Sequence, residues 1–173
     1  MQRIFDLLAR WIGIGRAFRI LFNLFPGFRS TGARVIAASD DYRYAKIRLP
    51  LTRKNRNYVG TIYGGSLYAC VDGIPMVQLI NILGDNYVVW DKSATIRFRR
   101  PATRTLYAEM CWTDELIEQI RNEIAAEKEN DYTITITLQD EDGTVYAEVD
   151  KVLYVADKAY YKEKRRRRQQ QAA

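Results

Sequence analysis

The chain has 173 residues, with 27 Lys and Arg against 21 Asp and Glu, and it contains no histidine. This length fits one domain, and an apolar fraction of 47% is sufficient for a packed core. The lack of histidine excludes Ser-His and Cys-His nucleophilic pairs, the usual zinc sites and Asp-His dyads. Acid–base chemistry near neutral pH is therefore left to carboxylates, tyrosines, lysines or bound water.

Residues 2–24 are expected to form an amphipathic helix that ends before Pro26 and Gly27. Apolar residues recur at spacings of three and four, and arginines cover much of the remaining surface. Such a stripe usually packs on the domain's own core or on a partner subunit. The alternative is a peripheral contact with the inner membrane surface, because basic residues beside an aromatic and aliphatic stripe suit a lipid interface.

No secretory signal is recognisable, because arginines interrupt the apolar N-terminal stretch. A membrane-spanning helix of about 20 mostly apolar residues is not expected either. Cys70 and Cys111 lie far apart and form no Cys-x-x-Cys pair, which is typical of a reducing compartment. We therefore expect a cytoplasmic protein without a disulfide scaffold.

Residues 29–157 are expected to form the folded domain. Segments 33–39 and 42–49 predict a hairpin, and residues 64–83 predict one long, nearly uncharged helix, kinked by Pro75. A short helix is expected at 114–128, and four further strands are expected at residues 87–100, 105–113, 132–139 and 144–155. This order predicts an α+β fold, in which a mostly antiparallel sheet wraps around one central helix.

The basic C-terminal segment, residues 158–173, contains the run Lys-Glu-Lys-Arg-Arg-Arg-Arg at 162–168. A run of this kind is most often a solvated, disordered tail. It could also contact anionic lipid or nucleic acid. Nucleic-acid binding is not expected, however, because no recognition motif accompanies the charge.

Four residues of the segment from Asn57 to Asp72 indicate a candidate site. Gly64 and Gly65 begin the predicted central helix, where unpaired backbone N–H groups can stabilise a developing oxyanion by ~3 kcal/mol. Asp72 follows about two turns later, where a carboxylate is costly unless it is exposed, paired or functional. Asn57 can orient water or substrate. These residues are equally compatible with an ordinary helix start and a structural aspartate.

The spacing Asn57-x-x-Gly60-Thr61-x-x-Gly64-Gly65, with Asp72 further along, resembles that of the PaaI-type hotdog-fold acyl-CoA thioesterases. Residues 90–98, closed by Arg100-Pro101-Ala102, are similar to the family's next strand. The resemblance implies a hotdog fold and gives Asp72 the role of general base or nucleophile. It further implies that Gly64, with Gly65, polarises the thioester carbonyl, and that Asn57 positions water or the carbonyl.

The resemblance also implies a homodimer or homotetramer, in which the aspartate and the glycine turn of one site come from different chains. The family commonly carries His-Gly-Gly, whereas this chain has Tyr63-Gly64-Gly65. A phenol, with an ordinary pKa near ~10, does not share proton transfer as an imidazole does. An uncharacterised bacterial branch with this Tyr-Gly-Gly turn is more similar still.

An acyl-CoA or acyl-carrier thioester is the substrate that this resemblance implies, with coenzyme A as part of the substrate and no other cofactor or metal. The candidate substrate-binding residues are Tyr63, Thr61, Asp91, Ser93, Arg97 and Arg99. Arginines can bind the phosphates of coenzyme A, although solvated surface is the more usual role of any one of them. The alternative function, suggested by the missing histidine, is a non-catalytic module that binds acyl-CoA or a fatty acyl chain.

Overall fold

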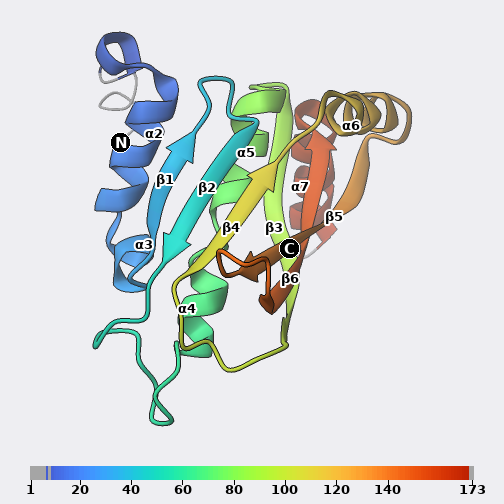
Figure 1. Cartoon of the computed structure of the whole chain (residues 1–173). Coiled ribbons are helices and arrows are strands. Elements are labelled where there is room, and N and C mark those ends of the chain that lie inside the picture. The colour runs from blue at the N-terminus through green and yellow to red at the C-terminus, as the bar shows by residue number, and fades with distance from the viewer. Residues whose placement is uncertain (1–6, 8, 172–173) are drawn as a thin grey trace.

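The structure is a computed structural model that describes residue 7 and residues 9–171. Its strands form one antiparallel six-stranded sheet in the order β1-β2-β4-β5-β6-β3 (Figure 1). The strands are β1 (Arg34–Ala38), β2 (Tyr44–Leu49), β3 (Tyr87–Phe98), β4 (Leu106–Cys111), β5 (Glu129–Gln139) and β6 (Val145–Asp157). The helices are α2 (Ile14–Leu24), α3 (Pro26–Ser30), α4 (Gly64–Ala69), α5 (Ile74–Leu83), α6 (Asp114–Glu127) and α7 (Lys158–Gln171).

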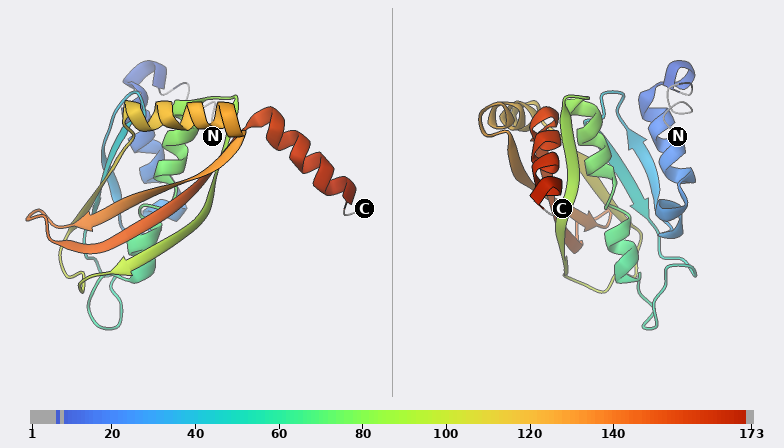
Figure 2. Two further views of the ribbon diagram at one scale, coloured as in Figure 1. Left: turned by 90° about the vertical axis from the view of Figure 1, so that its right-hand side faces the viewer. Right: turned by 180° about the vertical axis from the view of Figure 1, so that it is seen from behind.

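The sheet curves around α4 and α5, which lie on its inner face (Figures 1 and 2). In β2 and β4, buried residues alternate with less buried ones, and this period of two is what the sequence pattern predicted. Ile47 of β2 faces Ala108 of β4 across the ladder, and both side chains are buried. The hairpin, the four later strands and the short helix before β5 are therefore confirmed.

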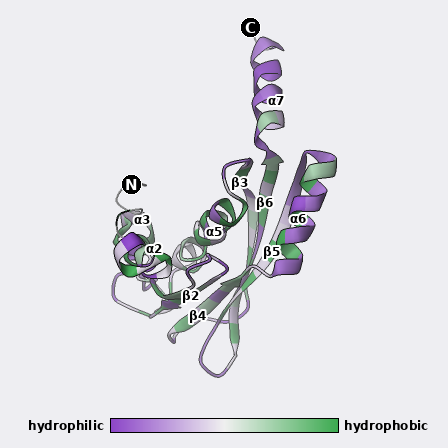
Figure 3. Cartoon of the chain, turned by 90° about the horizontal axis from the view of Figure 1, so that it is seen from above, coloured by the Kyte–Doolittle hydropathy of each residue, from purple (hydrophilic) through white to green (hydrophobic). Residues whose placement is uncertain are grey.

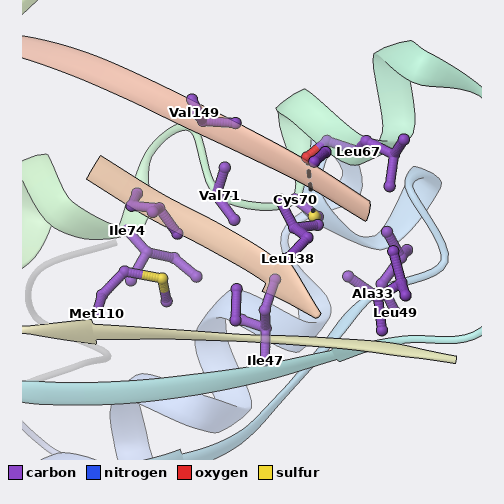
Figure 4. Close-up of a cluster of buried hydrophobic side chains, with 14 of the residues drawn as sticks. Ala33, Ile47, Leu49, Leu67, Cys70, Val71, Ile74, Met110, Leu138 and Val149 are labelled. Carbon is purple, nitrogen blue, oxygen red and sulfur yellow. Dashed lines mark hydrogen bonds between the residues drawn. The ribbon is translucent and has the colours of Figure 1, made fainter. Parts of the chain in front are cut away.

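The main core lies between the sheet and the two central helices. Figure 4 shows Cys70, Val71 and Ile74 among side chains from the neighbouring strands, including Leu138 and Val149. The thiol of Cys70 donates a hydrogen bond to the carbonyl of Leu67 at 3.3 Å, and burial raises the pKa of this thiol. Cys70 therefore acts as a small, protonated core side chain.

The central helix is not continuous as predicted. Helix α4 ends at Ala69, α5 begins at Ile74, and residues 70–73 form a turn between them. Pro75 lies in the first turn of α5, where a missing backbone N–H removes no helical hydrogen bond. The proline thus begins a second helix, and the break places Asp72 in the turn between the two.

By length and composition alone, residues 64–83 could cross a membrane, which contradicts the expectation that the chain lacks such a segment. Half of this stretch is buried inside the fold. The apolar helices of a protein core meet the same criterion, and here the stretch forms the two helices that the sheet encloses.

The N-terminal helix also breaks, at Gly13, whose φ of +88° favours glycine. The earlier part of the expected helix, residues 2–6 and 8, lies outside the described residues. The backbone N–H of Gly15 donates to Asp40 Oδ1 at 2.7 Å, and the amide of Asn23 pairs with both the N–H and the carbonyl of Val35. These contacts hold α2 along the edge strand β1.

We expect Gly15→Ala to lower the free energy of unfolding by about 1–3 kcal/mol, measured by urea denaturation. A Cβ atom on Gly15 would lie 2.3 Å from the carbonyl oxygen of Ala38, so α2 would have to move off β1. Gly73→Ala is the matched control, because its φ is −85° and its Cβ atom would meet nothing within 4 Å. The control should change stability by less than about 1 kcal/mol. Equal effects would contradict the close packing of α2.

Helix α7 corrects the expectation of a disordered C-terminal tail. Residues 158–171 are helical and project away from the body of the protein (Figures 2 and 3). Lysine, arginine, glutamate and glutamine are good helix formers, which accounts for a helix without a buried face. Lys164 also pairs with Glu129 of β5 at 2.5 Å, which ties the first half of α7 to the sheet.

Candidate active site

Asp72 is held by two donors from different elements. Its Oδ1 atom accepts a hydrogen bond from Lys151 Nζ at 2.6 Å and another from the hydroxyl of Tyr68 at 2.6 Å. The Asp72 side chain is 43% exposed, and its Oδ2 atom makes no hydrogen bond within the described part of the chain. One carboxylate oxygen is therefore fixed, and the other remains open to a ligand.

Lys151 is fully buried on the inner face of β6, between Val149 and Leu153 in the inward-facing row. Its ammonium group donates to Asp72 Oδ1, to the backbone carbonyl of Asp72 and, at 2.9 Å, to Asp91 Oδ1. A buried ammonium is costly unless it is paired and hydrogen-bonded, and here all three of its N–H donors are used. Lys151 therefore joins the turn between α4 and α5 to strand β3.

Asp91 reaches this cluster because of an irregularity in β3. The register of β3 against β6 shifts between Asp91, which pairs with Leu153, and Ser93, which pairs with Val152. Opposite residues in an antiparallel pair point to the same face, so Asp91 shares the inner face with Leu153. The bulge thus turns Asp91 toward Lys151 and leaves Ser93 on the outer face.

The protonation states follow from these contacts. Partial burial raises the pKa of Asp72, but hydrogen bonds from Lys151 and Tyr68 and the charge of Lys151 outweigh burial, so the net pKa is below its ordinary 3.8. For Asp91, burial and the negative charge of Asp72 prevail over the lysine, so its pKa is raised. Burial and the contact with Asp72 raise the pKa of Tyr68, which keeps this phenol protonated. Of the two carboxylates in the cluster, Asp72 is therefore the one that stays ionised to lower pH.

Gly64 and Gly65 begin α4, as the sequence predicted, and their N–H groups make no hydrogen bond to the described residues. A Cβ atom on Gly64 would lie 2.9 Å from the ring of Phe98, and one on Gly65 would lie 2.3 Å from the ring of Tyr63. Both rings are more than half exposed. Glycine at these two positions therefore lets the rings of Phe98, at the end of β3, and of Tyr63 pack closely against the start of α4.

Asn57 and Thr61 hold the loop that precedes α4. The Asn57 side chain accepts hydrogen bonds from the N–H groups of Val59 and Thr61 and donates to the hydroxyl of Thr61 at 2.8 Å. These bonds occupy both ends of the amide. In the described residues Asn57 therefore shapes the glycine loop and does not contact Asp72.

Arg97 and Arg99 are not brought to the cluster. Arg97 pairs with Asp150 at 2.6 Å, and the Nε atom of Arg99 donates to Glu148 at 2.8 Å. Both carboxylates belong to the row of β6 that alternates with buried Lys151, so these arginines lie with Ser93 on the outer face of the sheet.

Lys151 and Tyr68 are the members of the cluster that sequence reasoning missed. A detectable signal existed for Lys151, because it interrupts an alternating row of apolar residues in the strand predicted at 144–155. Tyr68 lies four residues before Asp72, a spacing that places two side chains on one helical face. Neither signal identifies the partner without the fold, because Lys151 is 79 residues from Asp72.

Residues 15–155 match the family described as "Domain of unknown function (DUF4442)", which covers most of the chain. The chain belongs to this family. A search of curated proteins finds no match to this DUF4442 protein.

A structure from Pseudomonas aeruginosa, described as a protein of unknown function and "Probable Thioesterase", is 27% identical. The matched region covers 80% of this chain and 93% of the Pseudomonas aeruginosa chain, with a TM-score of 0.70. A thioesterase from Haemophilus influenzae is 12% identical, covering 82% of this chain and 90% of its own, with a TM-score of 0.59. A protein of unknown function from Chlorobaculum tepidum is also 12% identical, covering 84% and 95%, with a TM-score of 0.65. The last two show the fold alone, and together these structures confirm the hotdog fold of this DUF4442 protein.

Proposed function

We propose that this DUF4442 protein hydrolyses a thioester, either an acyl-CoA or an acyl-carrier conjugate, with Asp72 as the reacting carboxylate. The observation that carries the proposal is that Lys151 and Tyr68 fix Asp72 Oδ1 and leave Oδ2 open. The Pseudomonas aeruginosa structure described as a probable thioesterase supports the same reaction class. Free Cys70 and Cys111 are compatible with a cytoplasmic location, which we include in the proposal.

Two routes use the same carboxylate. In the first, Asp72 Oδ2 takes a proton from water while the water oxygen bonds to the thioester carbonyl carbon, and the thiolate then leaves. In the second, Oδ2 bonds to that carbon itself, the thiolate leaves, and water hydrolyses the resulting mixed anhydride. Both routes require an ionised Asp72, which the contacts with Lys151 and Tyr68 favour.

A homodimer would complete the site. Strand β3 is the last strand of the sheet, so its outer edge carries unpaired backbone groups, and Trp90 and Phe98 on it are more than half exposed. If two copies of β3 pair antiparallel near Ala94, the end of one copy that carries Phe98 lies beside the part of the other that carries Asp91. Gly64, which lies beside Phe98, then approaches Asp72 of the second copy, where its N–H can bind the thioester carbonyl.

A panel of acyl-CoA and acyl-carrier thioesters tests the proposal. We expect release of free thiol in amounts well above one equivalent per subunit, detected with a thiol reagent. The alternative is a non-catalytic acyl-CoA or fatty-acyl binding module. It is favoured by Tyr63, which stands where the PaaI-type thioesterases commonly carry histidine. The binding module predicts that the thioesters raise the melting temperature of the protein without any release of thiol. This outcome would contradict the hydrolase proposal.

Gly64→Ala should lower kcat/KM by about tenfold or more, because the methyl group occupies the approach to an N–H that polarises the carbonyl. The exposed ring of Phe98 can move aside, so the free energy of unfolding should change by less than about 1 kcal/mol. Steady-state kinetics and urea denaturation measure the two effects. Unchanged kcat/KM would remove Gly64 from the site.

A further inference from the structure

Helix α2, the helical residues just before it and α3 after it present a surface that the proposed reaction does not use. We call it the α2 outer face, and it consists of the exposed apolar side chains and the exposed arginines of residues 7–29. The exposed fraction is 82% for Trp11 and 61% for Leu24. Its members are Leu7, Arg10, Trp11, Arg16, Arg19, Ile20, Leu24, Phe25 and Arg29.

The opposite face of α2 is already occupied. Ala17 and Phe18 are buried against the domain, and the hydrogen bonds of Gly15 and Asn23 fix the helix to its neighbours. The part of the α2 outer face that lies on α2 itself therefore cannot turn inward to bury its apolar side chains. It remains a fixed outer surface of the fold.

The charged side chains of residues 7–39 are all arginines, and the first carboxylate after them, Asp40, is bound to the N–H of Gly15 at the start of α2. Residues 7–39 contain five arginines and no Asp or Glu, whereas residues 40–157 contain 14 Lys and Arg against 19 Asp and Glu. Within the described residues, no ion pair involves Arg10, Arg16, Arg19 or Arg29. The basic residues of this face are thus available to an external anionic partner.

We propose that the α2 outer face docks on an anionic phospholipid surface. Aromatic and aliphatic side chains such as Trp11 and Leu24 enter the headgroup boundary, and the arginines bind lipid phosphates. A symmetric contact with a second copy is disfavoured, because it would bring two copies of the same basic face together. The inference is independent of the thioester chemistry, since it involves none of the residues around Asp72.

Flotation of the full-length protein with vesicles tests this assignment. We expect binding to phosphatidylcholine vesicles that contain phosphatidylglycerol and little binding to pure phosphatidylcholine. Ile20→Ser/Leu24→Ser should weaken binding about tenfold or more, because the protein loses two aliphatic side chains that enter the headgroup boundary of the vesicle. Circular dichroism and light scattering establish that the variant is folded and that its oligomeric state is unchanged.

Helix α7 supplies a control of equal charge. Two double variants each remove two positive charges: Arg16→Gln/Arg19→Gln on α2 and Arg165→Gln/Arg166→Gln on α7. The basic run of α7, unlike α2, contains no apolar side chain that could enter the lipid. The α2 pair should weaken vesicle binding several-fold more than the α7 pair. Equal losses, equal binding to neutral vesicles, or no binding at all would overturn the proposal. So would an oligomer that dissociates in Ile20→Ser/Leu24→Ser, because a second copy would then cover this face.

Discussion

Lys151→Met is expected to lower the free energy of unfolding by about 2–4 kcal/mol at neutral pH. The substitution keeps most of the side-chain volume but leaves Asp72 and Asp91 facing each other without the ammonium that joins them. Their side chains are 43% and 29% exposed, so water recovers part of the lost stabilisation and the cost stays below that of a fully buried charge. Urea denaturation at constant ionic strength measures the effect.

The loss should depend on pH in a defined direction. In the wild type the lowered pKa of Asp72 contributes stability above the ordinary carboxyl pKa of 3.8, and this contribution is lost as pH falls through the folded value. In Lys151→Met both carboxyl pKa values are raised by burial and mutual repulsion, so protonation stabilises the variant. The stability difference between the two proteins should therefore shrink as pH falls toward about 4.

Lys46→Met is the matched control, because Lys46 pairs with Glu109 at 2.9 Å on the surface of the sheet. An exposed pair of this kind contributes about 0–1 kcal/mol, so the control should cost far less than Lys151→Met. Equal effects of the two substitutions, or a difference that does not vary with pH, would show that Lys151 does not hold the two carboxylates together.

Asp72→Asn should reduce kcat/KM for thioester hydrolysis by about 100- to 10,000-fold. The amide oxygen of Asn can still accept from Lys151 and Tyr68, so the substitution removes the charge while retaining the geometry of the turn. The remaining Oδ2 position becomes an NH2 group, which neither takes a proton from water nor attacks the carbonyl carbon. Initial rates of thiol release, with protein that melts cooperatively, measure the loss.

Glu109→Gln is the control for this substitution, since it also removes a carboxylate that pairs with a lysine. Glu109 lies on β4, outside the cluster, and the variant should retain activity within about twofold. If Asp72→Asn were as active as Glu109→Gln, the carboxylate of Asp72 would have no chemical role.

The strands and the short helix α6 were predictable because period-two and helical apolar patterns are local properties of the sequence. The break in the central helix was only partly predictable. Pro75 indicated a disturbance, but an uncharged, apolar run gives no sign that the turn falls at residues 70–73. The helix α7 was missed because a charge run indicates solvation, whereas its residues also have high helix propensity.

Asp72, Gly64 and Gly65 could be selected from sequence because the helix start and the lone carboxylate have local signatures. Lys151 could not be paired with them, since that contact depends on which row of β6 faces the turn after α4. The inward orientation of Asp91 depends on a bulge at residues 91–93, and strict alternation would have placed Asp91 and Ser93 on one face. The outward ion pairs of Arg97 and Arg99 follow from that same shift.

The pH dependence of kcat/KM for wild-type thioester hydrolysis tests most directly whether an ionised Asp72 is the reacting group. The chain has no histidine, and the pKa of Asp72 lies below its ordinary value. The rate should therefore be measurable and nearly constant from about pH 6 to about pH 8, with its acid limb below that range. Hydrolysis undetectable at every pH, or an acid limb near neutrality that persists in Asp72→Asn, would contradict the account.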